Sequence, residues 1–183
     1  MLAKGIVRCK VDFRRTPITT TALDLARARF ALGTLESAPL PSLAAELLTA
    51  GLDSPSLRLL AGWNQPLMSE VGPLFERAMR ELGFLPLQKQ AALRLLARHY
   101  AHKILAGEID PYQGAMLIWT EVSAEYEPFE EISAFVGLAS QIDDYQQRAL
   151  SHPGPYEGYV EACNRDISAA AREYLDADNL TRD

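Results

Sequence analysis

Apolar residues recur at spacings of three and four through most of the chain, and this period constrains the fold more than any other feature. It is most regular over 155–175, where one face carries Tyr156, Tyr159, Val160, Cys163, Ile167, Ala170, Ala171 and Tyr174. The strings Asp53-Ser54-Pro55 and Asp110-Pro111 each combine a capping side chain with a proline, a combination typical of helix starts. The sequence therefore predicts an all-α fold.

Eight helices are expected from residue 20 onward. Their ranges are 21–33, 42–50, a short helix from Pro55 to near Gly62, 73–82, 87–106, 111–125, a helix that opens at Pro128 and is broken at His152, and 155–175. Because most connections are short, successive helices should be antiparallel neighbours. We expect a compact bundle of seven or eight helices in antiparallel hairpins, forming a single domain over 20–183. The string RLLA, at 58–61 and 94–97, leaves a helical-repeat solenoid as the alternative.

Residues 1–19 are expected to form an extended arm. Over 6–13, Val7, Cys9, Val11 and Phe13 alternate with charged residues, which is the period of a strand. No second strand pattern follows that could pair with it. A strand of this kind could pair with another copy of the chain, so a homo-oligomeric structural protein joined through 6–13 is one functional hypothesis.

The composition is that of a globular protein without a membrane span. Of the 183 residues, 48% are apolar and 23% are charged, and no stretch of about 18 apolar residues occurs. Charged residues interrupt the N-terminal segment, which therefore does not resemble a secretory signal. Cys9 and Cys163 lack metal-ligand spacing, which favours free thiols in a reducing compartment. We expect a cytoplasmic protein, and the pI of about 5.1 argues against nucleic-acid binding.

The charge is distributed unevenly between the two halves of the chain. Residues 1–105 carry 14 basic and 8 acidic residues, whereas 106–183 carry 4 and 16, so the net charges are +6 and −12. An acidic half can bind a basic partner, or it can pair internally with arginines of the other half such as Arg77, Arg80, Arg94 and Arg98. The leading hypothesis is a non-enzymatic protein-interaction module, such as an immunity-type or accessory protein. The candidate partner-binding residues lie off the apolar stripes and are Glu121, Glu125, Asp144, Glu157 and Glu161.

Asp143 is the one carboxylate that the helical period places near an apolar face. It follows Ala139 by four residues, about 40° around the helix, whereas Asp144 falls on the solvent side. A buried carboxylate needs a partner, so Asp143 is either part of a structural ion pair or hydrogen bond, or a ligand or catalytic base. The enzymatic alternative is therefore a small metal-dependent hydrolase or phosphate-handling enzyme that uses Asp143, Asp144 and nearby glutamates.

No complete catalytic or metal-binding pattern supports that alternative. The chain lacks a nucleophile elbow, a P-loop, a dinucleotide-binding glycine pattern and a CxxC pair. His99 and His102 share a helix but have no third ligand at a suitable spacing. We therefore predict no cofactor, no metal and no catalytic residue.

Three strings carry a resemblance to a known family: AGLDSPSLRLLAG at 50–62, AGEIDPYQGAMLIW at 106–119 and FVGLAS at 135–140. In order and wording the chain resembles a family of small helical bacterial proteins with no assigned activity, over roughly residues 40–145. The resemblance implies an all-α fold. It carries over no catalytic residue.

Overall fold

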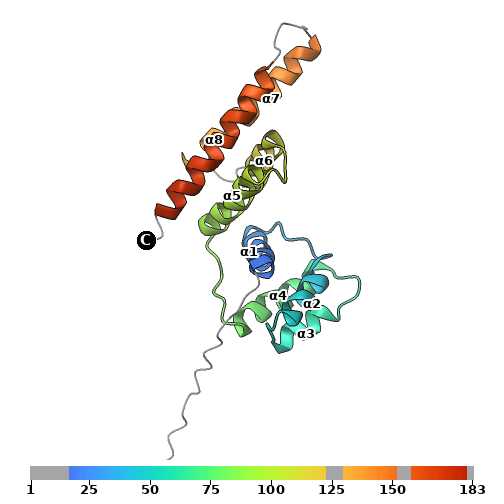
Figure 1. Cartoon of the computed structure of the whole chain (residues 1–183). Helices are drawn as coiled ribbons and strands as arrows, with labels where there is room; N and C mark the ends of the chain where they lie inside the picture. Colours follow the sequence, from blue (N-terminus) through green and yellow to red (C-terminus); the bar gives the residue numbers. More distant parts are fainter. Residues whose placement is uncertain (1–16, 123–129, 152–157, 181–183) are drawn as a thin grey trace, which may run out of the picture. The chain divides into compact units, whose positions relative to one another are not determined.

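The computed structural model describes residues 17–122, 130–151 and 158–180, and in these ranges the chain is all-α, as predicted. The α-helices are α1 (Pro17–Leu32), α2 (Leu40–Thr49), α3 (Pro55–Ala61), α4 (Met68–Glu81), α5 (Lys89–Leu105), α6 (Pro111–Leu117), α7 (Ser133–Ser151) and α8 (Tyr159–Leu180). A π-helical turn, η1 (Ile118–Val122), follows α6, and a 3-10 turn, η2 (Glu130–Ile132), precedes α7. Figure 1 shows the order of the helices along the chain.

The helices divide into two compact units. The first comprises residues up to Ala26 together with 35–85, and the second comprises 27–34 together with everything from Pro86 onward. Helix α1 therefore contributes to both units, whereas the sequence predicted one domain over 20–183. The strand predicted over 6–13 lies outside the described residues. The predicted arm of 1–19 is too long, because α1 begins at Pro17, a residue whose fixed φ suits the first turn of a helix.

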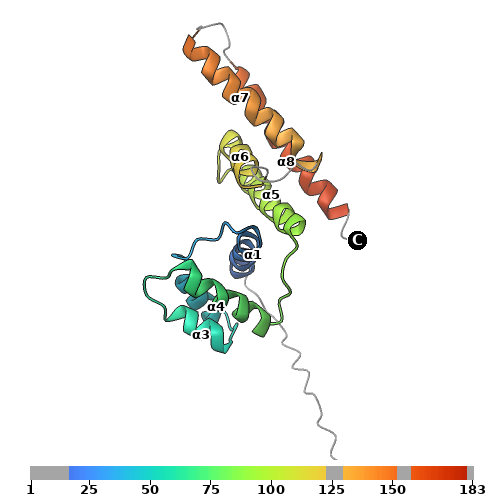
Figure 2. The same ribbon diagram turned by 180° about the vertical axis from the view of Figure 1, so that it is seen from behind.

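In the first unit, α3 packs against α4 (Figure 2) and also contacts α2. The buried side chains of the first unit include Leu40, Leu47, Leu57, Leu60, Val71 and Phe75. Helix α4 begins at Met68, so the predicted start at Gly72-Pro73 is wrong. The reason is packing: Val71 is fully buried and continues the stripe of Phe75 and Ala78 one turn upstream. Pro73 is exposed and lies inside the helix, where it has no amide to donate to the carbonyl of Ser69, and the helix forms in spite of that cost.

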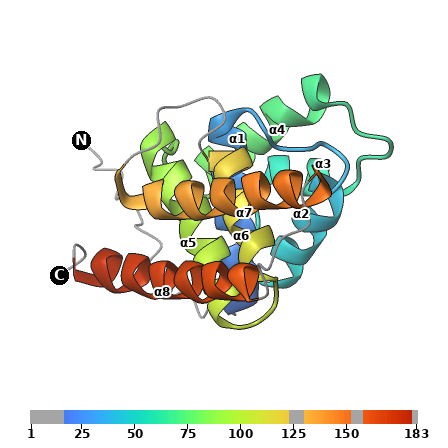
Figure 3. The ribbon, with the colours of Figure 1, turned by 90° about the horizontal axis from the view of Figure 1, so that it is seen from above.

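In the second unit, α8 contacts α5, α6 and α7. Figure 3 shows α8 running alongside α7. Helices α7 and α8 lie side by side as an antiparallel hairpin. The largest fully buried side chains here are Leu96, Ile118, Ile132, Phe135, Ile142 and Ile167. The Asp110 side chain caps α6 by accepting a hydrogen bond from the Gln113 amide at 3.2 Å, which confirms the predicted helix start.

The prediction of one α-helix over 111–125 is only partly correct. The chain switches to a π-turn at Ile118, and 123–129 lie outside the described residues. Ile118 is fully buried, whereas Trp119 is only partly buried. A π-turn has more residues per turn than an α-helix, so the α-helical phase does not extend through it.

Candidate functional site

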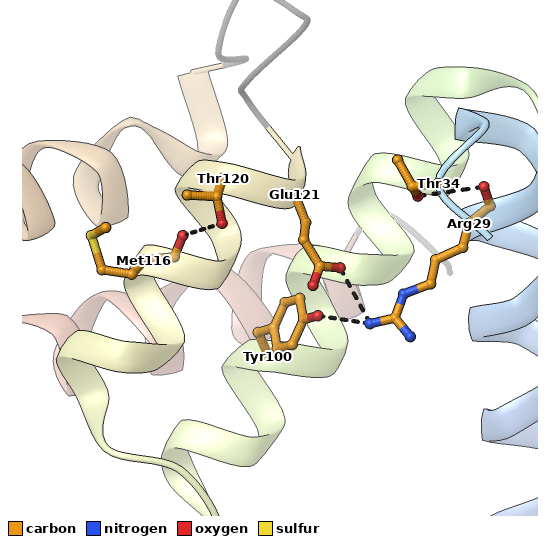
Figure 4. A network of polar contacts seen from close by, with 6 residues as sticks. All are labelled: Arg29, Thr34, Tyr100, Met116, Thr120 and Glu121. Atoms are coloured by element: carbon orange, nitrogen blue, oxygen red, sulfur yellow. Dashed lines mark hydrogen bonds and ion pairs between the residues drawn. The ribbon is translucent and has the colours of Figure 1, made fainter. Parts of the chain in front are cut away.

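Three polar features of the second unit are candidates for a functional site. The first joins the C-terminal turn of α1 to α5 and η1 (Figure 4). The Arg29 guanidinium donates to the Tyr100 hydroxyl at 3.0 Å and to the Glu121 carboxylate at 3.2 Å. Tyr100 is buried, while the side chains of Arg29 and Glu121 are 38% and 29% exposed. The π-turn brings Glu121 into this cluster.

The electrostatics of this cluster indicate a structural role. Burial, followed by the adjacent Glu121 carboxylate, raises the pKa of Tyr100 to about 12, so its hydroxyl stays protonated at neutral pH. The ring of His99 packs edge-on against Tyr100 with centroids 5.4 Å apart. Burial, followed by repulsion from Lys103, lowers the pKa of His99. The cluster thus holds a charge-neutral ion pair and two uncharged rings, and it offers no activated nucleophile.

The second candidate is a hollow of about 400 Å³ formed by α5, η2, α7 and α8. Its lining residues are Arg94, Glu131, Ala134, Ala170, Glu173, Tyr174 and Ala177. Arg94 and Glu131 form an ion pair at 3.0 Å, and the Tyr174 hydroxyl donates to the Arg94 carbonyl at 3.2 Å. The Tyr174 ring packs edge to face against the Phe135 ring, with a centroid distance of 6.0 Å. This hollow has small apolar side chains and a charged rim, and we call it the alanine hollow.

The third candidate lies on the α7–α8 hairpin and has a volume of about 370 Å³. It is lined by Gln141, Asp144, Tyr145, Arg148 and Tyr159, and we call it the tyrosine hollow. The two tyrosine rings are tilted against each other with centroids 5.1 Å apart. The Tyr159 hydroxyl donates to the Gln141 side-chain oxygen at 3.4 Å.

Three of the five predicted partner-binding residues are described by the structure, and they lie on three different elements, η1, α7 and α8. Glu121 is paired with Arg29, as described above, and is therefore not a free surface carboxylate. Asp144 is exposed and lines the tyrosine hollow, while Glu161 is exposed on α8. Glu125 and Glu157 lie outside the described residues.

Asp143 is partly buried and therefore less exposed than Asp144, in the direction that the helical phase predicted. Asp144 on the same helix is exposed. The Asp143 carboxylate accepts a hydrogen bond from the side-chain amide of Gln147, one turn along α7, at 3.0 Å. Asp143 also lies near Tyr112, whose pKa is raised mainly by burial and further by this carboxylate. The Asp143 carboxylate thus has one side-chain hydrogen-bond partner on its own helix and lies at the edge of the core.

The sequence did not identify the alanine hollow. Ala170 was assigned only to the apolar face of its helix, and nothing in the sequence singled out Ala134, Ala177 or Glu173 as part of a hollow. The only signal was the recurrence of small residues at Ala170 and Ala177, two turns apart on the face that bears Tyr174. Such a pattern does not reveal which other helix completes the hollow.

Within the described ranges, no three His, Cys, Asp or Glu residues are grouped so that they could hold a metal ion. Cys163, in α8, is buried and is a free thiol. None of the described helices has the length and apolar character needed to cross a membrane. No family model matches the chain, and no curated protein or solved structure matches it. The resemblance to a family of helical bacterial proteins therefore stays a prediction.

Proposed function

We propose that the chain is a non-enzymatic protein-interaction module that binds a basic segment of another protein in the alanine hollow. The observation that carries the proposal is that the hollow is lined by small apolar side chains together with one excess negative charge. An immunity-type or accessory protein would act through binding of this kind. The proposal keeps the partner class expected from the acidic C-terminal half but assigns the contact to Glu173, because Glu131 is paired with Arg94.

The shape of the hollow suits a protruding side chain. Its volume of about 400 Å³ falls within the roughly 300–1,000 Å³ that is usual for ligand pockets. The lining alanines are small and exposed or partly buried, while the buried Tyr174 is fixed by its hydrogen bond and by Phe135. A rigid aromatic beside small residues is the kind of surface on which an inserted side chain can be an energetic anchor.

The charge of the rim favours a cation. Arg94 neutralises Glu131, and within the described residues Glu173 forms no ion pair, so the lining carries one excess negative charge. A lysine or arginine could lay its aliphatic stem on the alanines and keep its charged head beside Glu173 in water. Such rim charges mainly steer association and set its salt dependence.

The test uses an alanine-based helical peptide with lysines one turn apart, titrated into the ¹⁵N-labelled full chain. We expect saturable shifts of the amide signals of Ala134, Ala170, Glu173 and Ala177. Added salt should lower the affinity that these shifts report. Because an exposed ion pair contributes about 0.2–1 kcal/mol, Glu173→Gln should weaken binding by up to about five-fold. Ala170→Leu should abolish binding, because the larger side chain would fill the alanine hollow.

Glu161→Gln is the matched control, since Glu161 is an exposed glutamate of the same helix outside the hollow. It should bind the lysine peptide as the unaltered chain does. A peptide with glutamates in place of the lysines should not bind. Equal binding of both peptides, or shifts that map away from the hollow, would contradict the proposal.

A further inference from the structure

The exposed face of α7 at the tyrosine hollow carries charges of both signs. Gln141, Asp144, Tyr145 and Arg148 follow one another at spacings of three, one and three residues, which places all four on one side of the helix. Asp144 and Arg148 are both exposed and stand one turn apart. This i, i+4 order is the favourable one for an intrahelical ion pair, yet among the described residues neither side chain forms any ion pair.

A surface with an acid and a base one turn apart is complementary to itself. A two-fold axis that crosses α7 between the two positions sets the helix antiparallel to its copy. Asp144 of each chain then faces Arg148 of the other, so two identical ion pairs form across the axis. This reciprocity, in which residue i meets residue j and j meets i, is the property of an isologous dimer contact.

The uncharged residues of the face suit the centre of such a contact. Tyr145 and Tyr159 pack against each other beside the two charges, and Tyr159 is 37% exposed. Tyrosine and arginine are enriched in the buried centres of protein interfaces. The hydrogen bond from Tyr159 to Gln141 ties α8 to α7 at this point, so both helices of the hairpin present one surface.

We infer that the tyrosine hollow is a self-association surface whose occupant is the same hollow of a second copy of the chain. The patch is small beside the roughly 1,600 Å² that standard interfaces bury, so the dimer is weak and forms only at high protein concentration. This inference uses none of the residues of the alanine hollow and does not depend on the proposed function.

The test is a charge swap read by analytical ultracentrifugation of the full chain over a wide concentration range. The unaltered chain should show a reversible monomer–dimer equilibrium. Asp144→Arg and Arg148→Asp should each weaken it by about ten-fold or more, because each turns two attractive pairs into two repulsive ones. The double variant Asp144→Arg/Arg148→Asp should restore the equilibrium, since complementarity returns with reversed signs.

Mixing the two single variants gives the sharpest outcome. One chain then carries two arginines and the other two aspartates, so they should form a heterodimer although neither forms a homodimer. The matched control reverses Glu161 and Arg165, an exposed pair with the same spacing on α8, and should leave the equilibrium unchanged. Circular dichroism of each variant checks that the helices persist. A chain that stays monomeric throughout, single variants that associate normally, or a mixture that does not associate would overturn the inference.

Discussion

Glu81, the last residue of α4, satisfies the start of α3. Its carboxylate accepts hydrogen bonds from the Ser56 amide at 2.9 Å and from the Ser56 hydroxyl at 2.8 Å. The next amide, that of Leu57, donates to the Ser54 hydroxyl at 3.2 Å. Two amides of the first turn, which have no partner within the helix, are thereby satisfied. Both serines are buried, so their polar groups depend on these contacts.

Glu81 should make the stability of the chain sensitive to acid. The hydrogen bond from the Ser56 amide, and then those from the serine hydroxyls, lower the pKa of Glu81 below its ordinary value. Its contribution is therefore complete above the unfolded pKa of about 4.3 and is lost as the pH falls through the lower folded pKa. Glu81→Gln should reduce stability at neutral pH and flatten the loss of stability on acidification, as measured by urea unfolding across pH. Glu76→Gln, at an exposed glutamate of the same helix, is the control and should keep the slope of the unaltered chain.

The sequence predicted the local cap at the start of α3 but not the hydrogen bonds from Ser56 to the distant Glu81. Asp53-Ser54-Pro55 was recognised as a helix start because capping depends on neighbouring residues, and Ser54 is indeed the cap. Asp53 instead pairs with Arg58. Glu81 lies 25 residues beyond Ser56, and only the packing of α4 on α3 brings the two together. No period or cap signal in the sequence encodes that approach.

At the scale of the elements, the sequence predicted which segments are helical. Where some helices begin, and which of their side chains are buried, depended on packing. The starts of α3 and α6 were predicted because a capping side chain and a proline act within one turn. The start of α4 was misplaced because burial of Val71 outweighs the signal of Pro73. The ion pair of Glu121 could not be predicted for a related reason, since Glu121 lies in a π-turn and its partner, Arg29, lies on a helix distant in the sequence. Tertiary contacts therefore decided which carboxylates remain on the surface.

Two helical glycines should respond oppositely to the same substitution. A Cβ on Gly114, in α6, would lie 2.5 and 2.7 Å from side-chain carbons of Ile104 and 2.9 Å from Ile109, so α5 and α6 approach closely there. Gly137, in α7, is exposed and would meet nothing within 4 Å. Gly114→Ala should cost about 1–3 kcal/mol through overpacking, whereas Gly137→Ala should gain about 0.5–1 kcal/mol from helix propensity.

Urea unfolding of the two glycine variants under identical conditions measures both changes. Each variant is the control for the other, because both replace glycine by alanine in a helix and only the surroundings differ. A stabilising Gly114→Ala would mean that Ile104 can turn aside freely. The close packing of α5 on α6 would then not depend on the missing Cβ.

For the whole molecule, the uneven charge is partly balanced inside the fold. Glu121 and Glu131 from the acidic half pair with Arg29 and Arg94 from the basic half, so the internal-complementarity alternative accounts for two carboxylates. Glu173, Asp144 and Glu161 remain without an ion pair among the described residues. The acidic charge available to a partner is therefore smaller than the net −12 suggests.

The placement of these carboxylates also bears on the hydrolase alternative. A magnesium site needs several oxygen ligands that converge on one point. Asp143 accepts a hydrogen bond from Gln147 at the edge of the core, while Asp144 faces the tyrosine hollow beside the positive charge of Arg148. We therefore predict that millimolar Mg²⁺ or Mn²⁺ leaves the melting temperature of the full chain unchanged relative to K⁺ at equal ionic strength. Because a ligand that binds only the native state raises that temperature, a specific increase would favour the hydrolase. If Asp143→Asn and Asp144→Asn then removed the increase, the enzymatic function would replace the binding function proposed here.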